Sequence, residues 1–193
     1  HPLEAQSPYA ASKVAADQLA LSFYKSFNLP VTVIRPFNTF GPRQSLRAVI
    51  PTIITQIFYG NKKVKLGTLN SRRDFTYVSD TVNGLISAIN NKKCVGETIN
   101  LGIGYDISIS NLFKKIKKLS GKKVKIIKDK KRIRPERSEV NRLISSNLKA
   151  KKLLKWKPKF TGAKGFEIAL KKTMEWFKNP DNLKYFKSEI YNV

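Results

Sequence analysis

The chain has 193 residues, of which 41% are hydrophobic and 10% aromatic, so it can bury a core, and its composition argues against intrinsic disorder. Its formal net charge is +25, but 29 of the 38 basic residues are lysines scattered over predicted helices and turns, which indicates a solvated basic surface. His1 is the only histidine and Cys94 the only cysteine, which excludes an internal disulfide and argues against a zinc site.

The first predicted element is a long helix over residues 9–27. Pro8 stands at an early helical position, where its missing N–H costs nothing. Ala10 and Val14 contribute to a small, apolar face of this helix. The Asn-Leu-Pro sequence at 28–30 is expected to end it.

Strands and helices then alternate along the chain, which predicts an α/β fold without internal repeats. A β-branched run at 31–34 predicts a buried strand, and the loop at 35–44 is rich in proline, glycine and asparagine. The apolar run at 48–54 is interrupted by Pro51 and Thr52 and is too short to cross a membrane. Further helices are predicted at 48–59, 80–90, 108–119, 146–154 and 163–177, and further extended segments at 63–66, 74–78, 98–101 and 124–127.

Tyr9 and Lys13 form a Y-x-x-x-K pattern within the first helix. Residues four positions apart stand on the same helix face, so the two side chains can meet. A tyrosine alone is a poor base at neutral pH, but a lysine ammonium close by favours the phenolate. The pair can then move a hydroxyl proton while a cofactor takes a hydride, and lysine can also hydrogen-bond a ribose. Tyrosine and lysine often occur at this spacing by chance, so the catalytic interpretation depends on the motifs around the pair.

Those motifs resemble, in their order, the extended short-chain dehydrogenase/reductases of the NAD-dependent epimerase/dehydratase type. SPYAASKVAAD at 7–17 and VTVIRPFNTFGPRQ at 31–44 resemble the catalytic helix, the next strand and the R-P-x-N-x-x-G-P loop of that family. RRDFTYVSD at 72–80, ETINLG at 97–102 and LLKWKP at 153–158 are similar to later family motifs, so the resemblance covers nearly the whole chain.

Within the family, the resemblance is greatest to nucleotide-sugar 4,6-dehydratases, and among these to the amino-sugar dehydratases of legionaminic acid-type pathways. Besides the two segments around the catalytic helix, it rests on RAVIPTII at 47–54 and RPERSEVNRL at 134–143.

The resemblance implies a site assembled from these motifs. Tyr9 would be the catalytic acid and base, with Lys13 as its partner. Arg73 and Arg134 match arginines that clamp a nucleotide diphosphate, and we expect them to converge on one site. The implied cofactor contacts are Tyr9, Lys13, Pro36, Phe37 and Asn38, and the implied substrate contacts are Asn38, Val49, Arg73, Asn100 and Arg134, with Arg43 and Arg47 as weaker candidates. No metal site is expected.

The expected architecture is the C-terminal part of a Rossmann-like, NAD(P)-binding fold with a small α/β substrate-binding domain. Residues 1–45 would be the last elements of the NAD-binding domain, 46–180 mainly the nucleotide-sugar-binding lobe, and 181–193 a tail. The sequence contains no G-x-x-G-x-x-G turn, which in this family holds the cofactor pyrophosphate. We therefore interpret the chain as a fragment that is inactive by itself.

The expected function is that of an NAD-dependent nucleotide-sugar 4,6-dehydratase. In this reaction a hydride leaves C4 of the sugar, water is eliminated, and the hydride returns to C6. A nucleotide-sugar 4-epimerase and a UDP-glucuronate decarboxylase-like enzyme remain alternatives, because the discriminating family segment precedes the Y-x-x-x-K helix. A basic nucleic-acid-binding module is the alternative from another class. We expect a cytoplasmic homodimer that binds a nucleotide-diphosphate sugar and neither nucleic acid nor membrane.

Overall fold

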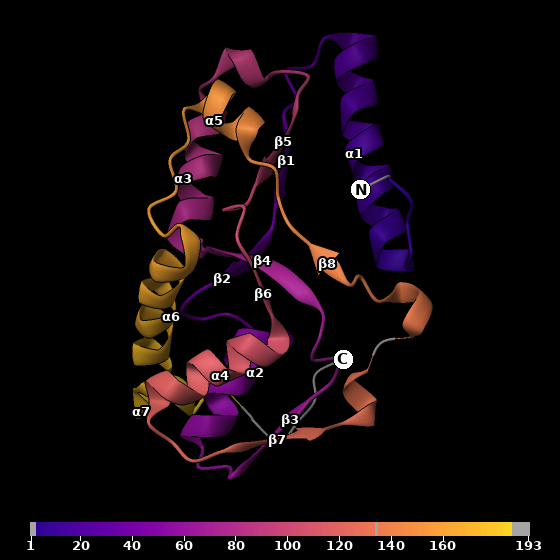
Figure 1. The fold of residues 1–193 in the computed structure, drawn as a ribbon. Coiled ribbons are helices and arrows are strands. Elements are labelled where there is room, and N and C mark those ends of the chain that lie inside the picture. Colours follow the sequence, from indigo (N-terminus) through magenta and orange to yellow (C-terminus); the bar gives the residue numbers. More distant parts are fainter. Residues whose placement is uncertain (1–2, 134, 187–193) are drawn as a thin grey trace.

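The computed structural model describes residues 3–133 and 135–186, which form three small sheets and the helices around them (Figure 1). Helix α1 (Pro8–Phe27) confirms the first predicted element. The Ser7 hydroxyl accepts the Ala10 N–H at its start, and Asn28 ends it in a left-handed conformation. None of its residues is buried. Across residues 3–133 and 135–186, the helices are all too short or too polar to cross a bilayer.

The first sheet is a parallel pair made by β1 (Val33–Pro36) and β5 (Thr98–Leu101). Helix α1 lies on one side of this pair, and α3 (Val78–Ile89) and α5 (Leu148–Leu154) lie on the other (Figure 1). Adjacent parallel strands with helices on both faces are the arrangement expected of an α/β protein, so that predicted class is confirmed. A small core packs beside the pair and contains Ala88, Cys94, Ile99, Leu101, Ala150, Leu154 and Trp156.

The second sheet is built around β4 (Arg72–Tyr77). β2 (Asn38–Phe40) pairs with it in parallel, and β6 (Asp106–Ser108) pairs with it antiparallel. β8 (Arg142–Leu143) adds a parallel contact at Arg72 and Arg73. β2, β6 and β8 were not predicted, because two or three residues are too few to show the alternation that identifies a strand.

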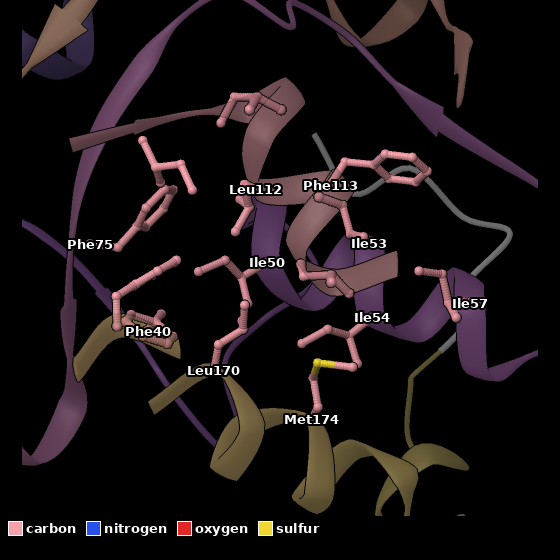
Figure 2. Close-up of a cluster of buried hydrophobic side chains, with 14 of the residues drawn as sticks. Phe40, Ile50, Ile53, Ile54, Ile57, Phe75, Leu112, Phe113, Leu170 and Met174 are labelled. Atoms are coloured by element: carbon pink, nitrogen blue, oxygen red, sulfur yellow. The ribbon is translucent and has the colours of Figure 1, made fainter. Parts of the chain in front are cut away.

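The largest core lies between α2 (Val49–Phe58), α4 (Ile109–Ser120) and α6 (Gly162–Lys178), next to the parallel pair of β3 (Lys63–Leu66) and β7 (Lys125–Lys128). Figure 2 shows its side chains meeting from these helices and from β2 and β4; the labelled ones are Phe40, Ile50, Ile53, Ile54, Ile57, Phe75, Leu112, Phe113, Leu170 and Met174. Short helical turns complete the chain at Lys92–Cys94, Lys130–Arg132, Glu136–Ser138 and α7 (Pro180–Leu183).

A buried carboxylate joins β4 to two distant loops. The Asp74 side chain is fully buried and accepts the backbone N–H groups of Ile103 at 3.1 Å, Gly104 at 2.9 Å and Ser145 at 3.1 Å. Burial raises the pKa of Asp74, although the three N–H donors act in the opposite direction. Because it links segments from three parts of the chain, this residue fixes where β4 lies.

A second carboxylate lies on the opposite side of the β4–β6 pairing from the large core. Asp106 is 8% exposed and accepts from the Nε of Arg72 at 2.8 Å and the Nε of Arg142 at 2.7 Å. The Arg72 and Arg142 guanidinium groups hold the pKa of the Asp106 carboxyl well below its ordinary value of 3.8. The ionised form therefore stabilises the contact between β4, β6 and β8.

We predict that Asp106→Asn lowers the free energy of unfolding by about 1–2 kcal/mol at pH 7, a value reduced by the exposure of both arginines. Because the folded-state pKa of Asp106 is depressed, its contribution is present above the ordinary pKa and is lost as pH falls through the folded value. Urea unfolding at pH 7 and at about pH 2.5, well below the ordinary pKa, should show the difference between variant and wild type shrinking in acid. Asp181→Asn, whose side chain is 82% exposed beside Lys184, is the control and should have no measurable effect. A difference that grows in acid would contradict this account.

Candidate functional site

A pocket of about 530 Å³ lies where the start of α1, the start of β2, α2 and β4 meet Arg132 and the segment 139–143. Its size is that of a small-molecule site. Its wall combines apolar and polar groups with several ionisable side chains. The apolar lining is Leu46, Ala48, Val49, Leu66, Phe75, Ile109, Val140 and Leu143; the polar lining is Asn38, Thr39, Gln44, Thr52, Thr68 and Ser71, with Gly67; the ionisable lining is Tyr9, Arg47, Arg73, Arg132 and Glu139.

Tyr9 contributes the phenol of this pocket from the first turn of α1. Its side chain is 73% exposed, so the hydroxyl is open to a ligand. The Lys13 ammonium lies 5.5 Å from the centre of the Tyr9 ring, as expected for residues four apart on a helix. The ammonium and the aromatic ring therefore form a cation–π contact at the start of α1.

One ion pair ties the Tyr9 helix to the first sheet. Asp17, two turns after Tyr9, accepts from the Nε of Arg35 in β1 at 2.6 Å. Arg35 directly precedes Pro36, the last residue of that strand. The ion pair therefore holds α1 at the carboxyl end of β1. Asn38, in the pocket wall, follows Pro36 by two residues.

Arg73 enters the pocket wall from β4. Its Nη2 lies 2.8 Å from Oε1 of Glu139, and its Nη1 donates to the backbone carbonyls of Arg72 and Val140. The side chains of Arg73 and Glu139 are only 14% and 15% exposed. A partly buried pair with this many hydrogen bonds fixes the guanidinium in one orientation.

Arg132 reaches the same pocket through a close approach between two backbones. The turn Lys130–Arg132 follows β7, and the Asp129 N–H donates to the carbonyl of Leu66. A Cβ on Gly67 would lie 2.0 Å from the Arg132 carbonyl oxygen, so only glycine permits this contact. The Arg132 Nε also lies 3.1 Å from the Asp129 carboxylate.

The pocket wall carries a positive charge. It contains three arginines, Arg47, Arg73 and Arg132, and Glu139 is the one carboxylate in the lining of the described residues. An excess of guanidinium groups around a cavity of this size suits an anionic ligand, and a diphosphate in particular can accept from two guanidiniums at once.

The structure brings five of the sequence-predicted site residues into the pocket lining, namely Tyr9, Asn38, Arg47, Val49 and Arg73. Asn38 uses its Nδ2 to donate to the backbone carbonyl of Asp74 at 3.0 Å, which fixes its side chain. Lys13, Pro36, Phe37, Arg43 and Asn100 are outside the lining.

The local backbone structure at two of the residues outside the lining is well defined. Asn100 pairs with Arg35 in the β1–β5 register, and Arg43 adopts a left-handed backbone conformation with φ of 65°. Arg134 lies outside the described residues, so its convergence with Arg73 stays a prediction. Arg132, two positions earlier, is the arginine of that segment that lines the pocket with Arg73.

Sequence reasoning missed several lining residues, among them Gln44, Ser71, Arg132 and Glu139. Glu139 had a usable signal, because it is one of only 13 acidic residues and follows a strongly basic stretch. The other three belong to residue types that are common in loops, and only the folded chain identifies them. Within residues 3–133 and 135–186, no three histidine, cysteine or acidic side chains gather as a metal site would require.

Comparison with known proteins gives the family. The sequence model of the family described as GDP-mannose 4,6 dehydratase matches residues 1–168. The chain is 34% identical over 184 residues to a UDP-glucuronate 4-epimerase of Thermodesulfobacterium geofontis (strain OPF15), covering 94% of this chain and 53% of the relative. The chain therefore spans about half the length of the curated relatives it matches.

Two solved structures share the fold. The first is dTDP-glucose 4,6-dehydratase from Bacillus anthracis in complex with NAD, with a TM-score of 0.79 and 29% identity over 93% of this chain and 54% of that one. The second is UDP-glucuronic acid 4-epimerase from Bacillus cereus in complex with UDP-glucuronic acid and NAD, with a TM-score of 0.79 and 27% identity over 90% of this chain and 53% of that one. The family match extends over most of the sequence, and residues from several of its motifs, Tyr9, Asn38 and Arg73 among them, line one pocket. The chain belongs to the GDP-mannose 4,6 dehydratase family, whose relatives are nucleotide-sugar dehydratases and epimerases.

Proposed function

We propose that this chain is the substrate-binding part of an NAD-dependent nucleotide-sugar 4,6-dehydratase, with Tyr9 as its acid and base. The observation that carries the proposal is that Tyr9 and Arg73, which are far apart in sequence, line one pocket. A diphosphate held at Arg73 allows the attached sugar to reach the phenol of Tyr9 within the same cavity. The dehydratase crystallised with NAD and the family description support the choice of reaction.

Residues of this chain fit the nicotinamide end of NAD. β1 and β5 are parallel, and ligands of α/β sheets bind beyond the carboxyl ends of such strands. Asn38 and Tyr9 both line the pocket just beyond the end of β1. We assign the nicotinamide and its ribose to Tyr9, Lys13 and the segment 36–38. When bound, NAD would supply the acceptor and later the donor of the hydride.

The remaining chemistry falls to side chains. The Lys13 ammonium stabilises the Tyr9 phenolate, whose Oη accepts the proton of the sugar C4 hydroxyl and becomes the phenol. Arg73, with Arg47 and Arg132 near it, binds the diphosphate and fixes the distance from the anchored end to the reacting carbon. We also assign Arg134 to this diphosphate site. The apolar lining from α2 and β4 excludes water from the bound nucleotide.

A 4-epimerase is the second candidate, and a specific observation favours it. A UDP-glucuronate 4-epimerase is 34% identical over 94% of this chain, and an epimerase with bound UDP-glucuronic acid has the same fold. Both reactions use the same proton transfer at C4, so Tyr9 and Arg73 keep their roles in either. Product analysis separates them, since a dehydratase releases a 4-keto-6-deoxy sugar and an epimerase an isomer of its substrate.

We predict that Tyr9→Phe in the full-length enzyme lowers turnover by roughly two to four orders of magnitude while folding and substrate binding are preserved. The change keeps the ring and removes only the hydroxyl that exchanges the proton. Keto-sugar formation from UDP-, GDP- and dTDP-sugars measures the effect. Tyr185→Phe is the matched control, because Tyr185 is 78% exposed and lies outside the pocket lining, and it should retain wild-type turnover. Wild-type turnover in Tyr9→Phe would show that the chemistry is wrongly assigned.

The 193-residue chain alone should not turn over a nucleotide sugar. Most of the binding energy of NAD comes from its pyrophosphate and adenosine, and these residues contain no G-x-x-G-x-x-G turn to hold them. The same keto-sugar assay on the isolated chain tests this. Full activity of the isolated chain would contradict it.

The net charge of +25 should not confer sequence-specific nucleic-acid binding, because most of the excess comes from scattered lysines. Any affinity for DNA should be weak and should fall steeply with salt, as expected for contacts to phosphates alone. Gel-shift titrations at low and physiological salt with two unrelated duplexes check this. Tight, sequence-selective binding at physiological salt would instead identify a nucleic-acid-binding module.

A further inference from the structure

Hydrogen bonds constrain the Arg73 side chain in the pocket wall. Its Nη2 pairs with Glu139 at 2.8 Å, and its Nη1 donates to the Arg72 carbonyl at 2.9 Å and to the Val140 carbonyl. Three of its five N–H donors are therefore used. Among the described residues, the Nε–H and the second Nη2–H have no hydrogen-bond partner, so they are available to a ligand in the pocket that Arg73 lines.

Glu139 and Val140 stand next to each other on the segment that leads into β8, and β8 pairs with β4 at Arg72 and Arg73. The backbone pairing thus brings the Glu139 carboxylate to the guanidinium, and both side chains are about 85% shielded from solvent. An arginine free to change rotamer loses conformational entropy when an anion fixes it, whereas one already held does not.

We propose that Glu139 is a positioning residue, which holds the Arg73 guanidinium so that its unused N–H donors meet the diphosphate of the substrate. This inference rests on the proposed function, because it assigns the anion to a nucleotide diphosphate. Glu139 acts through Arg73 and not by contact with the ligand. Its role was not apparent from the sequence motifs, which pointed to the arginines alone.

Charge and orientation make opposite predictions for this residue, which makes the proposal testable. A carboxylate 2.8 Å from the guanidinium reduces the positive potential that a diphosphate meets. If this charge effect were dominant, neutralising Glu139 would tighten anion binding. If orientation is dominant, the same substitution weakens anion binding because Arg73 becomes mobile.

The experiment is isothermal titration of the full-length enzyme with UDP, GDP and dTDP, followed by the variants with whichever nucleotide the wild type binds. Glu139→Gln should raise Kd about tenfold, the size expected for loss of a charge-assisted hydrogen bond that orients a ligand contact. KM for the nucleotide sugar should rise with Kd, while kcat changes little. Glu167→Gln removes another glutamate ion pair, with Lys115, outside the pocket and should leave Kd unchanged.

Two further variants separate the possible causes. Glu139→Asp keeps the charge and shortens the side chain, so a rise in Kd there reports lost geometry, and this variant carries the test if Glu139→Gln unfolds. Arg73→Lys cannot be oriented in the same way, because an ammonium lacks the planar fork. In the Arg73→Lys background, Glu139→Gln should have no additional effect on Kd.

Equal or tighter nucleotide binding by both Glu139 variants would overturn the positioning role while leaving the proposed function intact. A full effect of Glu139→Gln in the Arg73→Lys background would show direct ligand contact and would also overturn it. A wild-type enzyme that binds none of the three nucleotides and converts no nucleotide sugar would overturn the proposed function together with this inference.

Discussion

The buried carboxylate of Asp74 is the contact on which the arrangement of β4 depends. It accepts three backbone N–H groups from residues 103, 104 and 145, which belong to two loops far apart in the sequence. A fully buried carboxylate without these donors would carry a large desolvation penalty. Both loops must therefore pack against β4. The loop with residues 103 and 104 leads into β6, and the loop with residue 145 follows β8.

With β4 fixed, strand geometry separates its two arginines. Successive side chains of a strand point to opposite faces. Arg72 lies on the same face of the sheet as Asp106 of β6 and pairs with it, whereas Arg73 and Phe75 lie on the other face and line the pocket. The same alternation places Asp74 toward the loops that it binds. One six-residue strand therefore contributes a structural ion pair, a buried anchor and two pocket residues, and the register with β8 delivers Glu139 to Arg73.

The helix that carries Tyr9 has a different relation to the rest of the chain. α1 buries none of its residues, and Leu19 and Phe27 are 62% and 73% exposed. Its position relative to the pocket depends on its covalent link to β1, on the Asp17–Arg35 ion pair and on the close approach of the Tyr24 ring to Gly96. The internal geometry of Tyr9 and Lys13 is independent of this packing, because it follows from helical spacing alone. Helical spacing thus sets the Tyr9–Lys13 geometry locally, while tertiary contacts set the distance from Tyr9 to Arg73 and the other pocket arginines.

The sequence by itself determined the α/β class, most helices and strands, and the family, because helical and strand periodicity and the order of motifs are local properties of the chain. It also determined the Tyr9 and Lys13 pair and the choice of Arg73 as a site residue. Only the tertiary structure decided that Glu139, Arg132, Gln44 and Ser71 share a wall with Tyr9. It also decided that Pro36, Phe37, Arg43 and Asn100 remain outside that wall. The short strands β2, β6 and β8 escaped prediction for the same physical reason: each exists through pairing with β4, and a pairing between segments distant in sequence leaves no periodicity in either one.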